Sequence, residues 1–110
     1  MKQIRIYQSA NGKQPFTDWM KKLKDKTAMA QVNNRIRRLS IGQRGDFKRV
    51  GSGVYELRIH YGPGYRVYFS EYKGAVVLLL LGGDKGTQKK DIKQAISYWE
   101  DFKEQYREQS

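Results

Sequence analysis

The residues best suited to chemistry lie between positions 54 and 91. In 54–61 and 65–72 apolar and polar side chains alternate, which is typical of strands, so the polar ones should share one face. They are Glu56, Arg58, His60, Arg66 and Tyr68. The apolar segment that follows ends in Gly82-Gly83, and Lys85 comes two residues later, after Asp84, so we expect Lys85 at the rim of the same face.

These cations are suited to binding a phosphate group. Arg58 and Arg66 can each donate two parallel hydrogen bonds to phosphate, and Lys85 would add a third positive charge. Such a face suits cleavage of RNA by its own 2′-hydroxyl, because the substrate supplies the nucleophile and the protein must only position, neutralise and move protons. This chemistry requires no metal, and we expect no cofactor.

Proton transfer has several candidates. Histidine suits it near neutral pH, but His60 lies beside the turn and can be too far from the phosphate. Glu56 is a candidate base if Arg58 orients it, and Lys85 is one if nearby cations make it a weaker base. Tyr68 can donate to phosphate or stack on a nucleobase.

The same residues also have plainer interpretations. Cross-strand Glu, Arg, His and Tyr pairs often only solvate the open face of an antiparallel sheet. Gln88 and Asp91 flank the start of the last helix, where they either stabilise the helix end or orient Lys85.

The charge of the chain favours a polyanionic partner. The net charge is +11, and residues 1–55 hold 13 basic and 3 acidic residues against 9 and 8 in residues 56–110. We therefore predict a nucleic-acid surface, rather than a membrane surface, because no strongly apolar helical face accompanies the basic residues. The predicted RNA-binding residues are Arg35, Arg37, Arg38, Lys48, Arg49, Tyr68 and Gln88.

Hydrophobic periodicity gives the elements that must position these side chains. We expect a strand over 2–7, a helix over 15–23, a second helix carrying the stripe from Met29 to Leu39, and a last helix over 88–105. The glycine-rich segment 42–53 is predicted to be a loop, and 76–81 a central strand.

The strand pair 54–61 and 65–72 should form a hairpin around Gly62-Pro63-Gly64. A three-residue turn would place His60 opposite Arg66, Arg58 opposite Tyr68, and Glu56 opposite Ser70. The other face should join the core through Tyr55, Leu57, Ile59, Val67 and Phe69.

The element order predicts one α+β domain over 1–110, with helices against one side of a small sheet. The chain has no Cys and one His, so neither disulfides nor a thiolate or histidine-cluster metal site is expected. The longest apolar run, 75–81, is too short to span a bilayer, and nothing resembles a signal peptide, so we expect a soluble, cytoplasmic protein.

Several motifs resemble a known family. The strings GSGVYELRIHYGPGYRVYF and LLLLGGDKGTQKKDIKQA, preceded by QPFTDW and RIRRL, resemble the RelE/ParE toxin superfamily, specifically its HigB-like, phage-derived addiction module killer branch. The resemblance extends from about Ile4 to Trp99 and implies a RelE-like fold: an N-terminal strand, a helical hairpin, a three-stranded antiparallel meander and a C-terminal helix.

The resemblance also implies a function. It indicates a toxin of a type II toxin–antitoxin system, specifically a ribosome-dependent mRNA endoribonuclease, with a helix-turn-helix antitoxin as partner and operator DNA contacted only through that antitoxin. By position, Arg66 matches the family's phosphate-binding arginine, Arg58 matches a strand lysine, and Lys85 matches the basic residue after the following strand. Glu56 stands where RelE has another lysine and Asp91 where RelE has a catalytic tyrosine.

HigB-like members use acidic or histidine side chains at the variable positions, which keeps Glu56, His60 and Asp91 as acid–base candidates.

Three functions are compatible with the sequence, and a nuclease is the first of them. The alternatives to a nuclease are a ParE-like inhibitor of DNA gyrase and a nucleic-acid-binding module without catalysis, and fold alone does not separate them.

Overall fold

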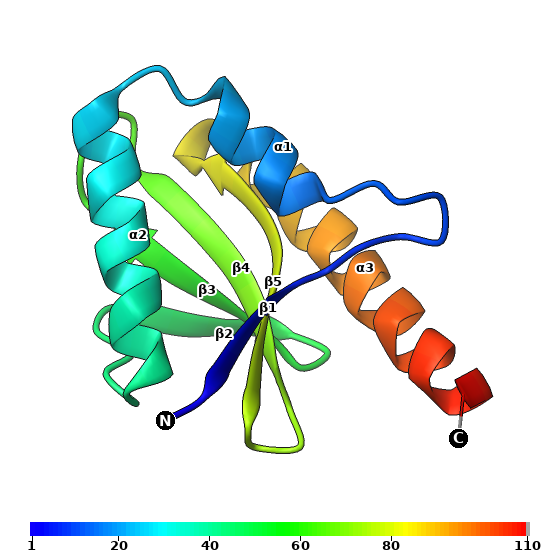
Figure 1. The fold of residues 1–110 in the computed structure, drawn as a ribbon. Helices are drawn as coiled ribbons and strands as arrows, with labels where there is room; N and C mark the ends of the chain where they lie inside the picture. Colours follow the sequence, from blue (N-terminus) through cyan, green and yellow to red (C-terminus); the bar gives the residue numbers. More distant parts are fainter. Residues whose placement is uncertain (110) are drawn as a thin grey trace.

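The computed structural model describes residues 1–109 as a five-stranded mixed sheet with three helices (Figure 1). The strands lie in the order β1-β5-β4-β3-β2; β1 runs parallel to β5, and the other neighbours are antiparallel. In chain order the elements are β1 (Gln3–Ile6), α1 (Pro15–Lys22), α2 (Lys26–Ser40), β2 (Phe47–Gly51), β3 (Val54–Ile59), β4 (Tyr65–Tyr72), β5 (Val76–Asp84), a 3-10 turn (Lys85–Thr87) and α3 (Gln88–Gln109).

The predicted helices and the alternating strands are confirmed. Pro15 occupies the first turn of α1, where its missing N–H costs nothing. The carboxylate of Asp25 accepts hydrogen bonds from the backbone N–H groups of Thr27 and Ala28, at 2.9 and 3.2 Å, and so caps α2. The N-terminal strand finds its partner in β5.

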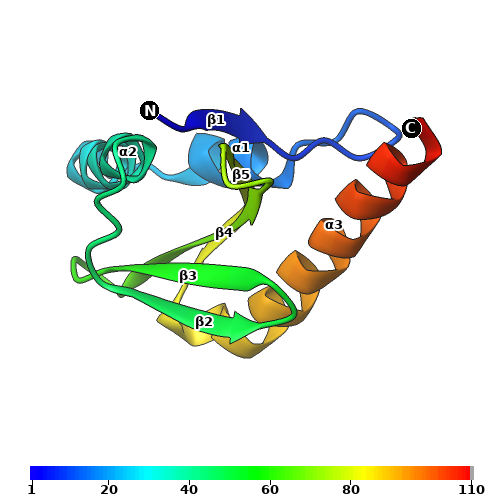
Figure 2. The same cartoon turned by 90° about the horizontal axis from the view of Figure 1, so that it is seen from below.

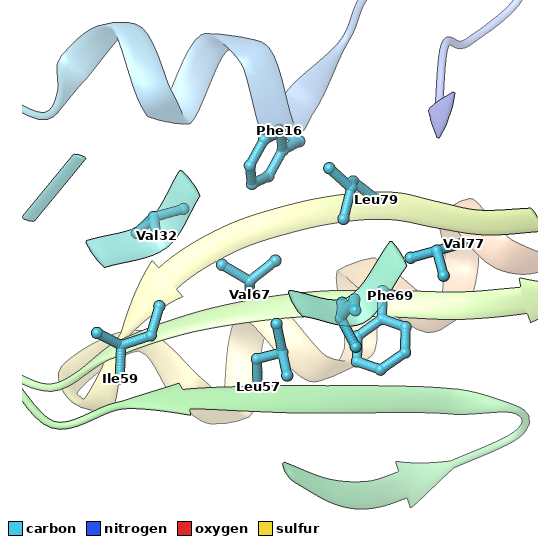
Figure 3. Packing of buried hydrophobic residues seen from close by; sticks show 9 residues of the cluster. Phe16, Val32, Leu57, Ile59, Val67, Phe69, Val77 and Leu79 are labelled. Atoms are coloured by element: carbon cyan, nitrogen blue, oxygen red, sulfur yellow. The ribbon is translucent and has the colours of Figure 1, made fainter. Parts of the chain in front are cut away.

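Helices cover both faces of the sheet, so the prediction that they lie on one side is wrong. Figure 2 shows α1 and α2 on one side of the sheet and α3 on the other. Each face has its own apolar core, one around Phe16, Val32 and Phe69 (Figure 3) and the other around Tyr68, Leu80 and Trp99. The apolar stripe of α3 needs a surface to cover, and the first face is already filled by α1 and α2.

Residues 47–51 form a strand, although the segment 42–53 was predicted to be a loop. Phe47 pairs with Leu57, Lys48 with Glu56 and Arg49 with Tyr55, which makes β2 an edge strand of the sheet. The strand is short and its register shifts between Arg49 and Gly51. Periodicity does not predict such an edge strand, because its apolar pattern is short and glycines flank it.

The register of the β3–β4 hairpin also differs from the prediction. Ile59 pairs with Tyr65, so the connection contains five residues, 60–64, rather than three. The backbone N–H of Gly64 donates to the carbonyl of Tyr61 at 3.1 Å and closes the turn. As a result Arg58 lies opposite Arg66 and Glu56 opposite Tyr68, while His60 has left the strand. A shift of two residues keeps every side chain on its predicted face.

β5 continues through Gly82 and Gly83, where a break was predicted. Both glycines are approached closely: a Cβ on Gly82 would lie 2.0 Å from the ring of Trp19, and a Cβ on Gly83 would lie 2.0 Å from Oδ2 of Asp91. β1 pairs with β5 only as far as Leu79, so the last residues of β5 have no strand on that side within the described chain. Over residues 1–109 there is no helix with the length and apolar character needed to cross a bilayer.

Candidate functional site

The strand register brings Arg58 and Arg66 together as direct cross-strand neighbours. Arg58 of β3 pairs with Arg66 of β4, which pairs in turn with Gly83 of β5. The adjacent row is Lys48, Glu56, Tyr68 and Leu81. Both rows lie on the face that α3 covers, close to the N-terminal end of that helix.

Glu56 is the buried centre of this cluster. Its side chain is fully buried, and its Oε1 accepts a hydrogen bond from Nε of Arg58 at 2.9 Å and lies 3.8 Å from Nε of Arg66. Its Oε2 accepts from Nε2 of Gln88 at 2.8 Å. A buried carboxylate is expensive unless paired and hydrogen-bonded, and here it offsets the repulsion between two adjacent guanidiniums. Both oxygens are engaged, so Glu56 holds the arginines in place.

The cations differ in their access to solvent. About 30% of the Arg58 side chain is exposed, against 9% for Arg66, whereas Lys85 is exposed. Gly64 lies between the last two, since a Cβ there would be 3.6 Å from both Nη1 of Arg66 and Cβ of Lys85. The backbone N–H of Lys85 donates to the carbonyl of Gly64 at 2.9 Å, which fixes the start of the lysine beside the arginine tip.

Tyr68 is buried beneath α3, which rules out stacking on a nucleobase in this conformation. Burial raises the pKa of its phenol, and the nearby carboxylates of Glu56 and Asp91 raise it further. Among the described residues, the hydroxyl of Tyr68 and Nε of Arg66 find no hydrogen-bond partner, although both atoms are buried. The expectation of an open polar face is therefore corrected: the cluster is accessible mainly from its rim.

Asp91 lies at the same end of the sheet, in the first turn of α3. Its Oδ2 accepts a hydrogen bond from the hydroxyl of Thr87 at 2.5 Å and packs against the backbone of Gly83, the cross-strand partner of Arg66. Burial raises the pKa of the Asp91 carboxyl, while Thr87 and the charge of Lys90 oppose that shift. A carboxyl whose pKa is raised and that lies close to cationic side chains is suited to proton transfer.

His60 lies away from this cluster. Its exposed imidazole pairs through Nε2 with the carboxylate of Asp46, before β2. This hydrogen bond lowers the pKa of Asp46. The predicted position opposite Arg66 is wrong, because the longer turn takes His60 out of the strand.

The basic residues predicted to bind RNA divide into two kinds. Arg35 is tied into the fold: it donates to the backbone carbonyls of Arg58, Arg44 and Asp46, at 2.5, 3.1 and 2.9 Å. The other basic residues are exposed, namely Arg37, Arg38, Lys48 and Arg49. Arg37 donates a hydrogen bond to Asn34, and the guanidinium of Arg49 lies 5.8 Å from the ring centroid of Tyr55.

Sequence reasoning missed Thr87 and Gly83, which position Asp91. The spacing of Thr87 and Asp91, four residues apart at a helix start, was an available signal. Over the described residues 1–109, no group of three or more Asp, Glu or His side chains is arranged to hold a metal ion.

Two comparisons place these residues among known sequences. Residues 18–98 match the family described as phage-derived protein Gp49-like (DUF891). A Haemophilus influenzae protein, described as uncharacterized, is 55% identical over 80 residues, which cover 73% of this chain and 81% of that protein. The matched region contains all the strands except β1 and the whole cluster around Glu56.

Proposed function

Because this chain belongs to the phage-derived Gp49-like family, a family of addiction-module killer, toxin-like proteins, we propose that it is a toxin that cleaves mRNA. The observation that carries the proposal is the pairing of Arg58 with Arg66 beside Lys85, held by the buried carboxylate of Glu56. Three cations of this geometry can bind one phosphodiester from the rim of the sheet.

The proposed reaction needs no group beyond the RNA and these side chains. The 2′-hydroxyl of the RNA loses its proton and attacks the adjacent phosphorus, and the bond to the 5′-oxygen of the next nucleotide breaks. The products are a 2′,3′-cyclic phosphate and a 5′-hydroxyl, and that leaving oxygen takes up a proton. Arg58, Arg66 and Lys85 stabilise the charge that develops on the phosphate oxygens.

Asp91 is the proposed proton-transfer residue. It lies near the arginine pair, burial raises the pKa of its carboxyl, and its Oδ2 accepts a hydrogen bond from Thr87. Glu56 is proposed as a positioning residue, since both its oxygens are occupied by Arg58 and Gln88.

The proposed setting of this reaction is the ribosome. The exposed basic residues of α2 and β2, Arg37, Arg38, Lys48 and Arg49, supply a surface that ribosomal RNA would attract. A toxin-like family implies a cognate antitoxin, and we propose that this antitoxin is a helix-turn-helix protein.

Primer extension on mRNA from cells that produce the protein tests this proposal. We expect cuts in codon register that appear only during translation. Arg58→Ala and Arg66→Lys should each reduce cutting at least about a hundredfold, because each removes a bidentate phosphate contact. Lys73→Ala, which removes an exposed lysine from the turn just after β4, is the control and should cut normally.

Two outcomes would overturn the proposal. Growth arrest by the folded Arg58→Ala, Arg66→Lys double variant at the wild-type level would exclude the arginine pair as the active group. Accumulation of cleaved DNA complexes in a purified gyrase supercoiling assay, without mRNA cuts, would establish the ParE-like activity instead. Arg66 is nearly buried, so thermal denaturation must first show that each variant is folded.

A further inference from the structure

A groove of about 810 Å3 lies between α1 and α3, over the end of β5. Its floor is the backbone of Leu81, Gly82 and Gly83, where β5 has run beyond the end of β1. Figure 1 shows this end of β5, in yellow, with α1 and α3 near it. Glu56, Arg58, Arg66 and Lys85 are not among the residues that line the groove, whereas Asp91 is, so the groove adjoins the phosphate-binding cluster without containing its cations.

The rim of the groove is basic. Lys13, Lys21, Lys22 and Lys90 line it, and the first three are exposed residues of the loop before α1 and of α1 itself. The acidic lining residues are less available. Asp91 is buried and bonded to Thr87, and Asp84 accepts a hydrogen bond from the backbone N–H of Gly86, which leaves Asp18 as the exposed carboxylate.

Two aromatic rings add flat surfaces to this basic groove. Trp19 is half-buried over Gly82, and Tyr98 is half-buried and stacked on Tyr7 with ring centroids 5.0 Å apart. A basic groove with aromatic side chains along it is the usual construction for binding single-stranded nucleic acid, in which lysines contact phosphates and rings stack on bases.

The groove is continuous with the arginine cluster. Gly83 lines the groove and is the cross-strand partner of Arg66, and Asp84 lines it and is followed directly by Lys85. An RNA chain whose phosphate is held by Arg58, Arg66 and Lys85 therefore meets the groove within a short distance along the end of β5.

We propose that the groove between α1 and α3 binds the single-stranded RNA segment that adjoins the phosphate held at the arginine cluster. This inference rests on the proposed nuclease function and extends its substrate site to lysines and aromatic rings outside the strand face that carries Arg58 and Arg66. The groove contributes affinity for a longer RNA, whereas the arginine cluster contributes the reaction.

Binding of RNA that cannot be cleaved tests the inference. The probes are fluorescein-labelled, fully 2′-O-methylated RNAs of about three and about nine nucleotides, which lack the nucleophile. Fluorescence anisotropy with the purified chain should show at least about tenfold tighter binding of the longer probe. The double variant Lys21→Ala, Lys22→Ala should remove that difference and lower the salt dependence by about one unit of slope for each lost phosphate contact.

Lys24→Ala, Lys26→Ala is the matched control. It removes the same charge from exposed positions that do not line the groove, so it should bind the longer probe within about twofold of wild type. Equal weakening by the two double variants would overturn the inference, because the lysines would then act only through the general field. A Glu-Val repeat peptide is the probe for the alternative occupant, an acidic peptide that pairs with the free edge of β5. If this peptide binds and its binding depends on Lys21 and Lys22, whereas RNA binding does not, the inference is overturned.

The outcomes for the groove and for the nuclease are distinguishable. If Arg58→Ala loses mRNA cutting while the double variant Lys21→Ala, Lys22→Ala binds the longer probe as wild type does, the nuclease proposal stands and the groove is excluded as an RNA site. Binding of the longer probe that depends on the groove lysines, without any cutting of mRNA, would support the groove as an RNA site and exclude the nuclease proposal.

Discussion

At the residue scale, the site depends on two buried carboxylates, Glu56 and Asp91. Glu56 balances two guanidiniums, and this balance allows Arg58 and Arg66 to stand side by side. Removing one partner of such a buried group leaves an uncompensated charge, which costs several kcal/mol. Asp91 has a different environment, since burial has the largest effect on its pKa and its hydrogen bond comes from the neutral hydroxyl of Thr87.

Asp91→Asn should stabilise the protein at neutral pH. The pKa of Asp91 is raised in the folded state, so the folded protein binds this proton more readily than the unfolded chain. The associated stability is present at low pH and is lost as the pH rises through the folded pKa. The variant should therefore have a higher Tm than wild type at pH 7 and a smaller advantage near pH 3, measured by thermal denaturation.

Glu100→Gln, on an exposed part of the same helix, is the control and should change the Tm little at either pH. The same Tm difference for Asp91→Asn at both pH values would contradict the assigned cause. If Asp91 also moves a proton in the reaction, the stabilised variant should cut mRNA more slowly, which is a common relation between stability and activity.

At the element scale, Arg35 links α2 to β3 and to the segment that leads into β2. Arg35 of α2 donates to three backbone carbonyls, two in the segment before β2 and one at Arg58 in β3. This clamp holds the edge strand that carries Lys48 across from Glu56. Through Arg35 the helix therefore positions one border of the cluster, including the backbone of Arg58.

Arg35→Ala should destabilise the fold by about 2 kcal/mol, because one half-buried carbonyl, that of Arg58, and two exposed carbonyls lose a charged donor. Arg38→Ala, an exposed arginine one turn further along α2, should stay within about 0.5 kcal/mol of wild type. Urea denaturation followed by circular dichroism measures both. Equal stability of the two variants would show that Arg35 does not hold β2.

At the scale of the whole molecule, the charge of +11 is carried on a compact body with a radius of gyration of 13.2 Å. Opposing carboxylates are largely engaged: Glu71, for example, pairs with both Lys2 and Arg44. The remaining positive charge attracts polyanions from any direction, so it affects how fast a nucleic acid associates with the protein rather than how the chain folds.

The affinity for single-stranded RNA should fall about a hundredfold between about 50 and 200 mM salt, as expected if about five phosphates are contacted. The Tm should not fall over the same range, because salt also screens the repulsion among the protein's own charges. Anisotropy titrations and thermal denaturation at matched salt concentrations test this pair of expectations. An affinity that changes less than about twofold would contradict an electrostatic RNA surface.

Periodicity determined the helices, the β3–β4 hairpin and the assignment of side chains to faces, since each of these depends on neighbours a few residues apart. It placed Glu56, Arg58 and Arg66 on one face, and the structure keeps them there despite a different register. Periodicity did not predict the short strand β2, because its five residues show too little alternation of apolar and polar side chains to be distinguished from a loop.

Only the tertiary structure decided which face each helix covers. The same alternation describes an open polar face and a face covered by a helix, so burial of Tyr68 and Glu56 under α3 had no local signal. The pairing of Arg58 with Arg66, the clamp made by Arg35 and the groove over Gly82 and Gly83 likewise join segments far apart in the chain. Local sequence determines which way a side chain points, whereas its neighbour depends on long-range packing, to which the whole chain contributes.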